Sequence, residues 1–194
     1  MFIELTDHLR CPADHEEAYL VLLPSRMAGR RVVDGSLGCP VCGRMVEVRD
    51  GVVAFGGGVP ATGETGLTPE GAQALLGISG PGGYLALAGA ATSLVPGLAG
   101  LLPGVHLVAL NPVPGSPADS PASVLRGARM SLKTSSMRGV ILGADLTSAR
   151  DWVEDAARAV LPGLRVVGEG GDAADLPALE LLAAAGGCWV GRKR

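Results

Sequence analysis

Four residues in the first part of the chain have the types and the spacing of a zinc site. Cys39 and Cys42 lie in a C-P-x-C-G knuckle, whose glycine lets backbone N–H groups turn toward the thiolates. Cys11 begins a second C-P turn in "CPADH", and His15 follows it. Zinc accepts imidazole more readily than a lone carboxylate beside three thiolates, so we favour His15 as the fourth ligand, with Asp14 as its substitute. Either set closes a tetrahedral shell, which predicts structural Zn²⁺ rather than catalytic Zn²⁺.

Other states of these cysteines are less consistent with the sequence. In one alternative, Cys11 is an ordinary small buried residue and the knuckle holds no metal. A disulfide between Cys39 and Cys42 is disfavoured, because four cysteines in 194 residues are far below the density of disulfide scaffolds. The first residues, "MFIELTDHLRC", lack the basic and apolar regions of a signal peptide. These features predict a reducing, cytoplasmic location. Cys188 lies in an apolar strand and is expected to be a core thiol.

The elements around the knuckle are short and predict a small β module over residues 1–55. Strands are expected in "YLVLLP" and "RRVVDGSLGCP". The segment "RMVEVRDGVVAF" predicts a hairpin, because Asp50-Gly51 is a strong two-residue turn signal. Residues 56–66, "GGGVPATGETG", have the composition of a linker, so we place a domain boundary there.

Residues 67–194 alternate between strand and helix patterns. A helix is expected to begin at Thr68 as N-cap with Pro69 in its first turn. Further helices are predicted in "ATSLVPGLAGLL", "SARDWVEDAARAVLPG" and "DLPALELLAAAG", and strands in "YLALAG", "VHLVALNP", "RGVILGAD", "LRVVGEG" and "CWVGRK". This alternation predicts a doubly wound, mostly parallel sheet. The fold class is therefore α/β, with a small β zinc ribbon before that sheet.

One long segment has no charged side chain. Residues 71–118 contain no Asp, Glu, Lys or Arg, a pattern that on length and apolarity alone suggests a membrane span. Pro96, Pro103 and the glycine-rich interruptions argue against a span, because lipid offers no partner for broken backbone hydrogen bonds. We expect instead a buried strand, helix and strand, and no transmembrane segment. Apolar surface left over on this region would have to be covered, which suggests a protein partner.

Charge composition argues against nucleic acid as a ligand. The formal net charge is −3, and the only basic cluster is residues 192–194. Proteins that neutralise phosphates carry a broader Lys/Arg footprint.

The motifs "LTDHLRCPADH" and "LGCPVCGRMVEVRDGVVAF" together resemble the small zinc-ribbon activator family, the partner subunit of tRNA, rRNA and release-factor methyltransferases. The resemblance covers residues 1–55. It departs from the family at Asp14, which stands where a second cysteine is frequent, and it lacks the aromatic-proline pair after the knuckle. What the resemblance implies is a protein-binding module that supports a methyltransferase fold.

Residues 67–194 resemble a shortened S-adenosylmethionine-dependent methyltransferase domain. In "YLALAGAATSL", Gly89 matches the first glycine of that family's cofactor turn, while Ala91 and Ser93 replace the later glycines. Asn111 in "LVALNP" stands where the family has an acid for the ribose hydroxyls, and an amide lacks that charge. The resemblance implies a retained fold with an eroded S-adenosylmethionine site, at best weakly formed by Gly89 and Asn111.

Three hypotheses follow for function. The first is a non-catalytic, methyltransferase-like scaffold or subunit that binds a protein partner through residues 71–118 or through the zinc ribbon. The second is an active small methyltransferase with a divergent cofactor loop. The third is a binding module for another small ligand or for a membrane surface. Asp145, at a strand end, is expected to be a helix cap rather than a catalytic acid.

Overall fold

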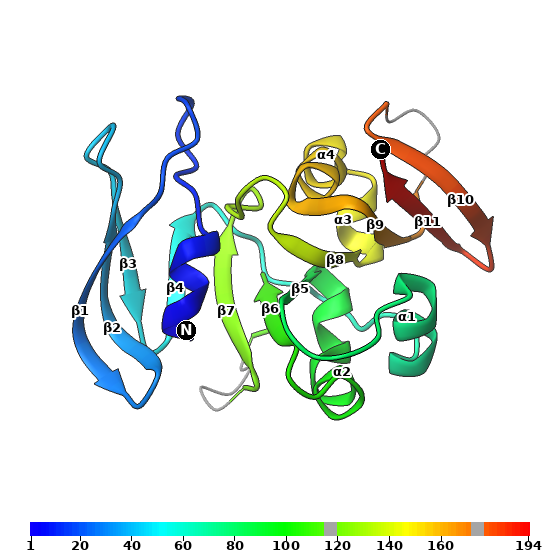
Figure 1. Ribbon diagram of the computed structural model, residues 1–194, viewed down its shortest axis with the longest axis horizontal. Helices are drawn as coiled ribbons and strands as arrows, with labels where there is room; N and C mark the ends of the chain where they lie inside the picture. The colour runs from blue at the N-terminus through cyan, green and yellow to red at the C-terminus, as the bar shows by residue number, and fades with distance from the viewer. Residues whose placement is uncertain (115–119, 172–176) are drawn as a thin grey trace.

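One sheet runs through the whole molecule (Figure 1). The computed structural model describes residues 1–114, 120–171 and 177–194. The sheet has 11 strands in the order β1-β2-β3-β4-β7-β6-β5-β8-β9-β11-β10. The strands are β1 (Val21–Ala28), β2 (Arg31–Gly38), β3 (Met45–Arg49), β4 (Val52–Gly56), β5 (Tyr84–Ala88), β6 (His106–Leu110), β7 (Ala122–Gly127), β8 (Met137–Leu142), β9 (Val160–Glu169), β10 (Leu179–Ala185) and β11 (Cys188–Lys193). The helices are η1 (Ile3–His8), α1 (Pro69–Leu76), η2 (Gly89–Leu94), α2 (Val95–Leu101), α3 (Ala144–Thr147) and α4 (Arg150–Ala159).

Strands β1 to β4 form an antiparallel meander at one end of the sheet. The turn between β3 and β4 is Asp50-Gly51, with φ of 49° and 77°, as a two-residue hairpin turn requires. The predicted hairpin is therefore confirmed. β4 then pairs in parallel with β7, so the meander and the rest of the chain belong to one sheet.

The centre of the sheet is parallel, and the strand order reverses on either side of β5. Such a reversal is the switch point at which doubly wound sheets hold ligands, at the carboxyl ends of the strands. Five of the ten strand pairings of the whole sheet are antiparallel, three in the meander and two, β9–β11 and β11–β10, at the other end, so the sheet predicted for residues 67–194 is parallel except at that end. β7 was not predicted; it follows a proline-rich loop that obscures its short apolar pattern.

The predicted helix over "DLPALELLAAAG" is wrong within the described residues. Residues from Leu179 to Ala185 form β10, which pairs antiparallel with β11; residues 175 and 176 lie outside the described residues. Gly186 and Gly187 have φ of 62° and 77° and turn the chain back, so hairpin pairing overrides the helix propensity of Leu and Ala. The helix predicted over 148–163 also ends early, because β9 begins at Val160.

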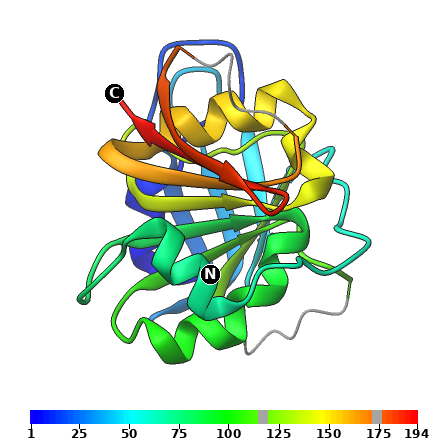
Figure 2. The ribbon, with the colours of Figure 1, turned by 90° about the vertical axis from the view of Figure 1, so that its right-hand side faces the viewer.

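Side chains on the two faces of the sheet build two cores. On β5, Leu85 and Leu87 contact the core beneath α1 and α2, whereas Ala86 and Ala88 face the core that α4 covers with Trp152. Helices thus cover both faces of the parallel centre (Figure 2). The charge-free region supplies β5, η2, α2 and β6, and among its described residues the one exposed large hydrophobic side chain is Leu101. No helix of the described residues is long and apolar enough to cross a membrane.

Candidate functional site

The structure brings together the four residues that the sequence nominated as metal ligands. Ligand atoms of Cys11, His15, Cys39 and Cys42 all lie within 4.8 Å of one another. The Sγ atoms of Cys11 and Cys42 are 3.7 Å apart, and Cys39 Sγ is 3.4 Å from His15 Nε2. Tetrahedral Zn²⁺ places two sulfurs about 3.8 Å apart and a sulfur and a nitrogen about 3.5 Å apart. The donor set and its spacing therefore fit Zn²⁺. Asp14 is outside this cluster.

The hydrogen bond of His15 leaves one ring nitrogen free for a metal. Its Nδ1 lies 2.6 Å from the carbonyl oxygen of Glu16. A carbonyl only accepts, so Nδ1–H donates and Nε2 keeps its lone pair toward the cysteines. The same hydrogen bond is the main cause that raises the pKa of His15.

The thiols of the cluster differ in their ease of ionisation. Burial opposes ionisation of Cys39, but the N–H groups of Cys42 and Val41 point at its sulfur and lower the pKa of Cys39 to about 6. Burial raises the pKa of Cys11 to about 11. Cys39 therefore ionises before Cys11, and a bound cation would favour ionisation of Cys11. Gly43, which follows Cys42, has a φ of 70°, and its N–H donates to the Cys39 carbonyl at 3.0 Å, which closes the knuckle turn.

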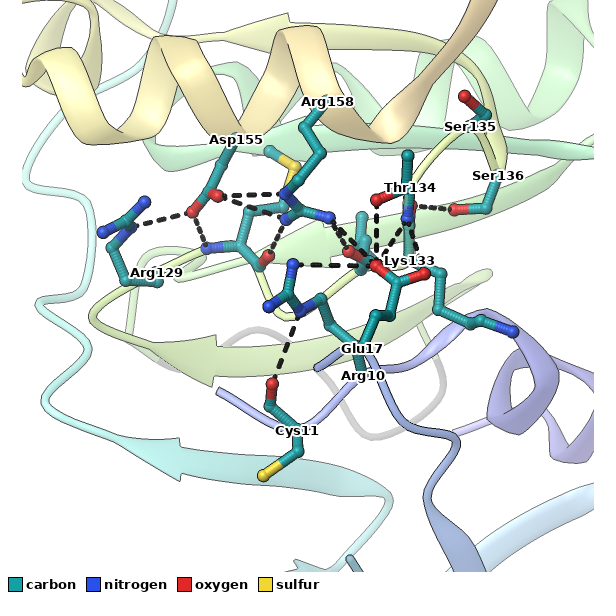
Figure 3. A network of polar contacts seen from close by, with 12 residues as sticks. Arg10, Cys11, Glu17, Arg129, Lys133, Thr134, Ser135, Ser136, Asp155 and Arg158 are labelled. Carbon is teal, nitrogen blue, oxygen red and sulfur yellow. Dashed lines mark hydrogen bonds and ion pairs between the residues drawn. The ribbon is translucent and has the colours of Figure 1, made fainter. Parts of the chain in front are cut away.

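The segment that carries Cys11 and His15 also contacts residues that are distant in the sequence, Thr134 and Arg158. We call residues 10–17 the metal loop. Arg10 Nε donates to the Cys11 carbonyl, and its Nη1 lies 3.6 Å from Glu17 Oε2. Glu17 in turn accepts hydrogen bonds from the N–H and the hydroxyl of Thr134, and lies 3.8 Å from Arg158 on α4. Figure 3 shows these contacts as one network. The metal loop is thus fastened to α4.

Asp155 is the buried acid of this network. Its side chain is 9% exposed, and it accepts hydrogen bonds from Arg129 Nε, Arg158 Nη2 and the N–H of Met130. Arg158 also donates to the carbonyls of Met130 and Leu132. Sequence reasoning missed this network, because its members are distant in sequence and the only local signal is the i, i+3 spacing of Asp155 and Arg158 on one helix.

The residues predicted to hold S-adenosylmethionine, Gly89 and Asn111, follow β5 and β6 at the carboxyl ends of these strands, where the strand order reverses. We call this place the switch-point edge. The polar groups there form hydrogen bonds with other residues of the chain. The amide of Asn111 donates to the Gly127 carbonyl and accepts from the Gly127 N–H, at 2.8 and 3.0 Å. The N–H of Ala90, which follows Gly89, donates to Asp145 Oδ1 at 2.9 Å. Asp145 therefore anchors the turn between β5 and η2. The expected helix cap is wrong, because the N-cap of α3 is Gly143 and that of α4 is Ala149.

The predicted linker runs across this same edge. We call residues 58–66 the strap; it follows β4 and precedes α1 (Figure 2). The N–H of Ala61 donates to the Asn111 carbonyl at 3.0 Å, and Ala61 is 3% exposed. Farther along, the Thr65 hydroxyl and the Gly66 N–H both donate to the carboxylate of Glu169, each at 2.6 Å.

Backbone contact is closest at the start of the strap. A Cβ at Gly58 would lie 2.5 Å from both Asn111 Oδ1 and the Gly127 nitrogen. Only glycine fits there without a shift of the backbone. The strap therefore packs directly against the strand ends at which a cofactor would be expected.

Exposed apolar side chains gather on the meander. Of the 11 large hydrophobic side chains that are exposed among the described residues, seven lie between residues 19 and 59. Val21 and Met45 flank Gly38 in one cross-strand row, and Leu23 lies two residues along β1 on the same face. These three are 52%, 56% and 56% exposed. We call Val21, Leu23 and Met45 the meander patch.

Comparisons with known proteins give weak similarities. No family model matches the sequence, and no curated protein matches it. The antibiotic-resistance methyltransferase Kmr is 15% identical, with a TM-score of 0.43, over 70% of this chain and 97% of that chain. A SAM dependent methyltransferase from Aquifex aeolicus is 11% identical, with a TM-score of 0.45, over 64% and 88% of the two chains. A complex containing the Haloferax volcanii Trm112 methyltransferase activator gives 18% identity and a TM-score of 0.41, over 50% of each chain. TM-scores this low do not assign a function, so the assignment depends on the chain's own residues.

Proposed function

We propose that this protein is a non-catalytic scaffold or subunit of a protein complex, stabilised by structural Zn²⁺ at Cys11, His15, Cys39 and Cys42. The observation that carries the proposal is the strap. The chain's own residues 58–66 lie across the switch-point edge, where a doubly wound sheet would bind its cofactor. Asn111 and the N–H of Ala90 already have partners within the protein.

The metal would act on structure. Three thiolates and one imidazole close a tetrahedral shell, which leaves no position for a substrate or a reactive water. When bound, Zn²⁺ would tie the metal loop to the knuckle and so support the network between the loop and α4.

A protein partner would bind at the meander patch. The apolar side chains of the charge-free region are mostly in the two cores, so they offer little surface to a partner. Val21 and Leu23 are exposed on β1, and Met45 is exposed on the same face of β3 across Gly38. Among the described residues, no strand pairs with the outer edge of β1. This location supports the zinc ribbon, rather than residues 71–118, as the partner-binding part.

Two measurements test the proposal. Calorimetric titration of the purified chain with S-adenosylmethionine and with S-adenosylhomocysteine should give no heat at millimolar ligand. Binding at micromolar concentration would instead support an active small methyltransferase. Metal analysis should give about one zinc per chain, as a single four-ligand shell requires. A Cys42→Ala variant should lose the metal. Cys188→Ala should keep it, because Cys188 is the one cysteine of the chain that lies outside the cluster.

A further inference from the structure

The three cysteines of the metal cluster differ in their access to solvent. Cys42 is exposed, whereas Cys11 and Cys39 are 2% and 3% exposed. Oxidation of a cysteine requires the thiolate form and access for the oxidant. All three cysteines would bind Zn²⁺ as thiolates, so exposure is what distinguishes them. A small oxidant that arrives from solvent therefore meets the sulfur of Cys42 first.

A buried sulfur on another segment lies within reach of Cys42. Cys11 Sγ is 3.7 Å from Cys42 Sγ. A disulfide needs an S–S distance of about 2 Å, so a side-chain movement of less than about 2 Å would bring the two sulfurs together. The Cys39 sulfur lies 3.4 Å from His15 Nε2 instead. Cys42 and Cys11 thus have the arrangement of a redox pair, in which an exposed cysteine reacts with the oxidant and a neighbouring cysteine resolves it.

We propose that Cys42 and Cys11 form a peroxide-sensitive switch, which exchanges the metal-bound state of the cluster for a disulfide. This inference rests on the zinc site proposed above. The Cys42 thiolate attacks hydrogen peroxide and becomes a sulfenic acid, while the O–O bond breaks and one hydroxide leaves. The Cys11 thiolate then attacks the Cys42 sulfur, forms the S–S bond and displaces a second hydroxide. Two thiolates lose two electrons to the peroxide, and each hydroxide takes a proton from solvent to give water.

The disulfide leaves Cys39 and His15 as the remaining ligands of the cluster. Two ligands do not make the four-coordinate shell of structural Zn²⁺, so the oxidised cluster should release the ion. The new bond still joins the metal loop to the knuckle, across 31 positions of the chain. Because it connects the same two segments as the metal, it should retain part of the stabilisation that the metal provides.

The switch lies next to the surface at which we propose that a partner binds. Gly38 ends β2 immediately before the knuckle, and Met45 of the meander patch begins β3 immediately after it. Within the turn, the Cys39 N–H donates to the Arg44 carbonyl at 2.9 Å. Oxidation therefore changes the ligation of the turn that positions Met45, and exchange of the Cys39 amide should accelerate.

The test uses the full chain after metal analysis has shown its zinc content. Hydrogen peroxide is added in modest excess, zinc release is followed with a metallochromic dye, and free thiols are counted after unfolding. About one zinc should be released for every two thiols lost, and peptide mapping should find Cys11 joined to Cys42. A thiol reductant together with Zn²⁺ should restore the starting state. Cys188→Ala is the matched control and should respond like the unaltered chain, because Cys188 lies outside the cluster.

Thermal unfolding separates disulfide formation from simple loss of metal. The peroxide-treated chain should have a Tm on the order of 5 °C above that of the reduced chain in chelator, because the disulfide constrains the unfolded state. Amides of residues 10–17 should also exchange more slowly in the treated chain than in the chelated one. Cys42→Ser can form neither the metal shell nor this disulfide, so peroxide should not raise its Tm.

The inference is overturned if peroxide consumes thiols without releasing zinc, or if the mapped disulfide joins Cys39 to Cys42 or includes Cys188. Equal Tm values for the peroxide-treated and the chelated chain would also overturn it, because the new bond would then not hold the metal loop to the knuckle. A chain purified without zinc contradicts the zinc site itself. A chain that binds zinc and keeps it in peroxide contradicts only the switch.

Discussion

The switch-point edge and the network between the metal loop and α4 differ in the kind of polar contact that holds them. At the edge, the side chain of Asn111 is paired twice with Gly127, and the strap covers the strand ends. In the network, the carboxylates of Asp155 and Glu17 contact the guanidinium groups of Arg10, Arg129 and Arg158. The place where the fold leads one to expect a ligand is therefore closed by hydrogen bonds of the chain itself, whereas charged groups connect the metal loop to α4. Function has to be inferred from the groups at a site, because the fold alone does not determine it.

Metal removal should separate the two regions most strongly. The metal loop carries Arg10 and Glu17 of the network, whereas the strap contacts no residue of that loop in the hydrogen bonds of the described chain. A chelator should lower the free energy of unfolding by an amount on the order of 5 kcal/mol. It should lower Tm by roughly 10 °C or more.

Hydrogen exchange shows where this loss occurs. Amides of residues 10–17 and 129–136 should lose protection on chelation, while the amide of Ala61, bonded to Asn111, should keep it. Equal loss of protection at both places would show that the metal stabilises the molecule as a whole and that the comparison has no basis.

The second prediction concerns Asp155, the buried acid of the network. Asp155→Ala should destabilise the chain by about 3 kcal/mol, because it leaves Arg129 and Arg158 without their shared carboxylate. Glu154→Ala, on the same helix and in an exposed pair with Arg150, should cost less than about 0.5 kcal/mol. Urea unfolding of both variants gives the comparison. A similar cost for the two would mean that burial of the network contributes little.

Local signals in the sequence were sufficient for part of this structure. Asp50-Gly51 specified its hairpin turn, and Thr68 caps α1, accepting a hydrogen bond from the Gly71 N–H. The two C-P motifs likewise identified the residues that lie together in the cluster. In each case a few consecutive residues determine the geometry by themselves, so spacing is informative.

What the sequence did not reveal depends on contacts between distant segments. Glu17 meets Thr134 across 117 positions, and Thr65 meets Glu169 across 104. The linker composition of residues 56–66 did not indicate that residues 58–66 pack against strand ends. β10 was misread for the same reason, since its pairing with β11 is a tertiary contact that its Leu and Ala residues do not announce.

The third prediction loosens the strap. Glu169→Ala removes the acceptor of the Thr65 hydroxyl and of the Gly66 N–H, and should cost about 1 to 2 kcal/mol. Glu180→Ala, in an exposed pair with Arg192 on the neighbouring hairpin, is the control. Exchange at the Gly66 amide should accelerate only in the first variant.

Calorimetry of the Glu169→Ala variant should still give no heat with S-adenosylmethionine, because Asn111 stays paired with Gly127. If Glu169→Ala binds the cofactor and the unaltered chain does not, the strap is an inhibitory element over a working site.

The smallest expected effect is a pH dependence from Glu17. Burial alone would raise the pKa of Glu17, but the N–H and hydroxyl of Thr134, with Arg10 and Arg158, hold it below its usual value. A carboxyl with a depressed pKa in the folded state stabilises that state above its unfolded pKa. This stabilisation is lost as the pH falls through the folded pKa. The unaltered chain should therefore lose more stability than Glu17→Gln between about pH 5 and pH 3. Urea unfolding at several pH values measures this difference, and parallel losses in the two chains would place Glu17 outside the network that fastens the metal loop to α4.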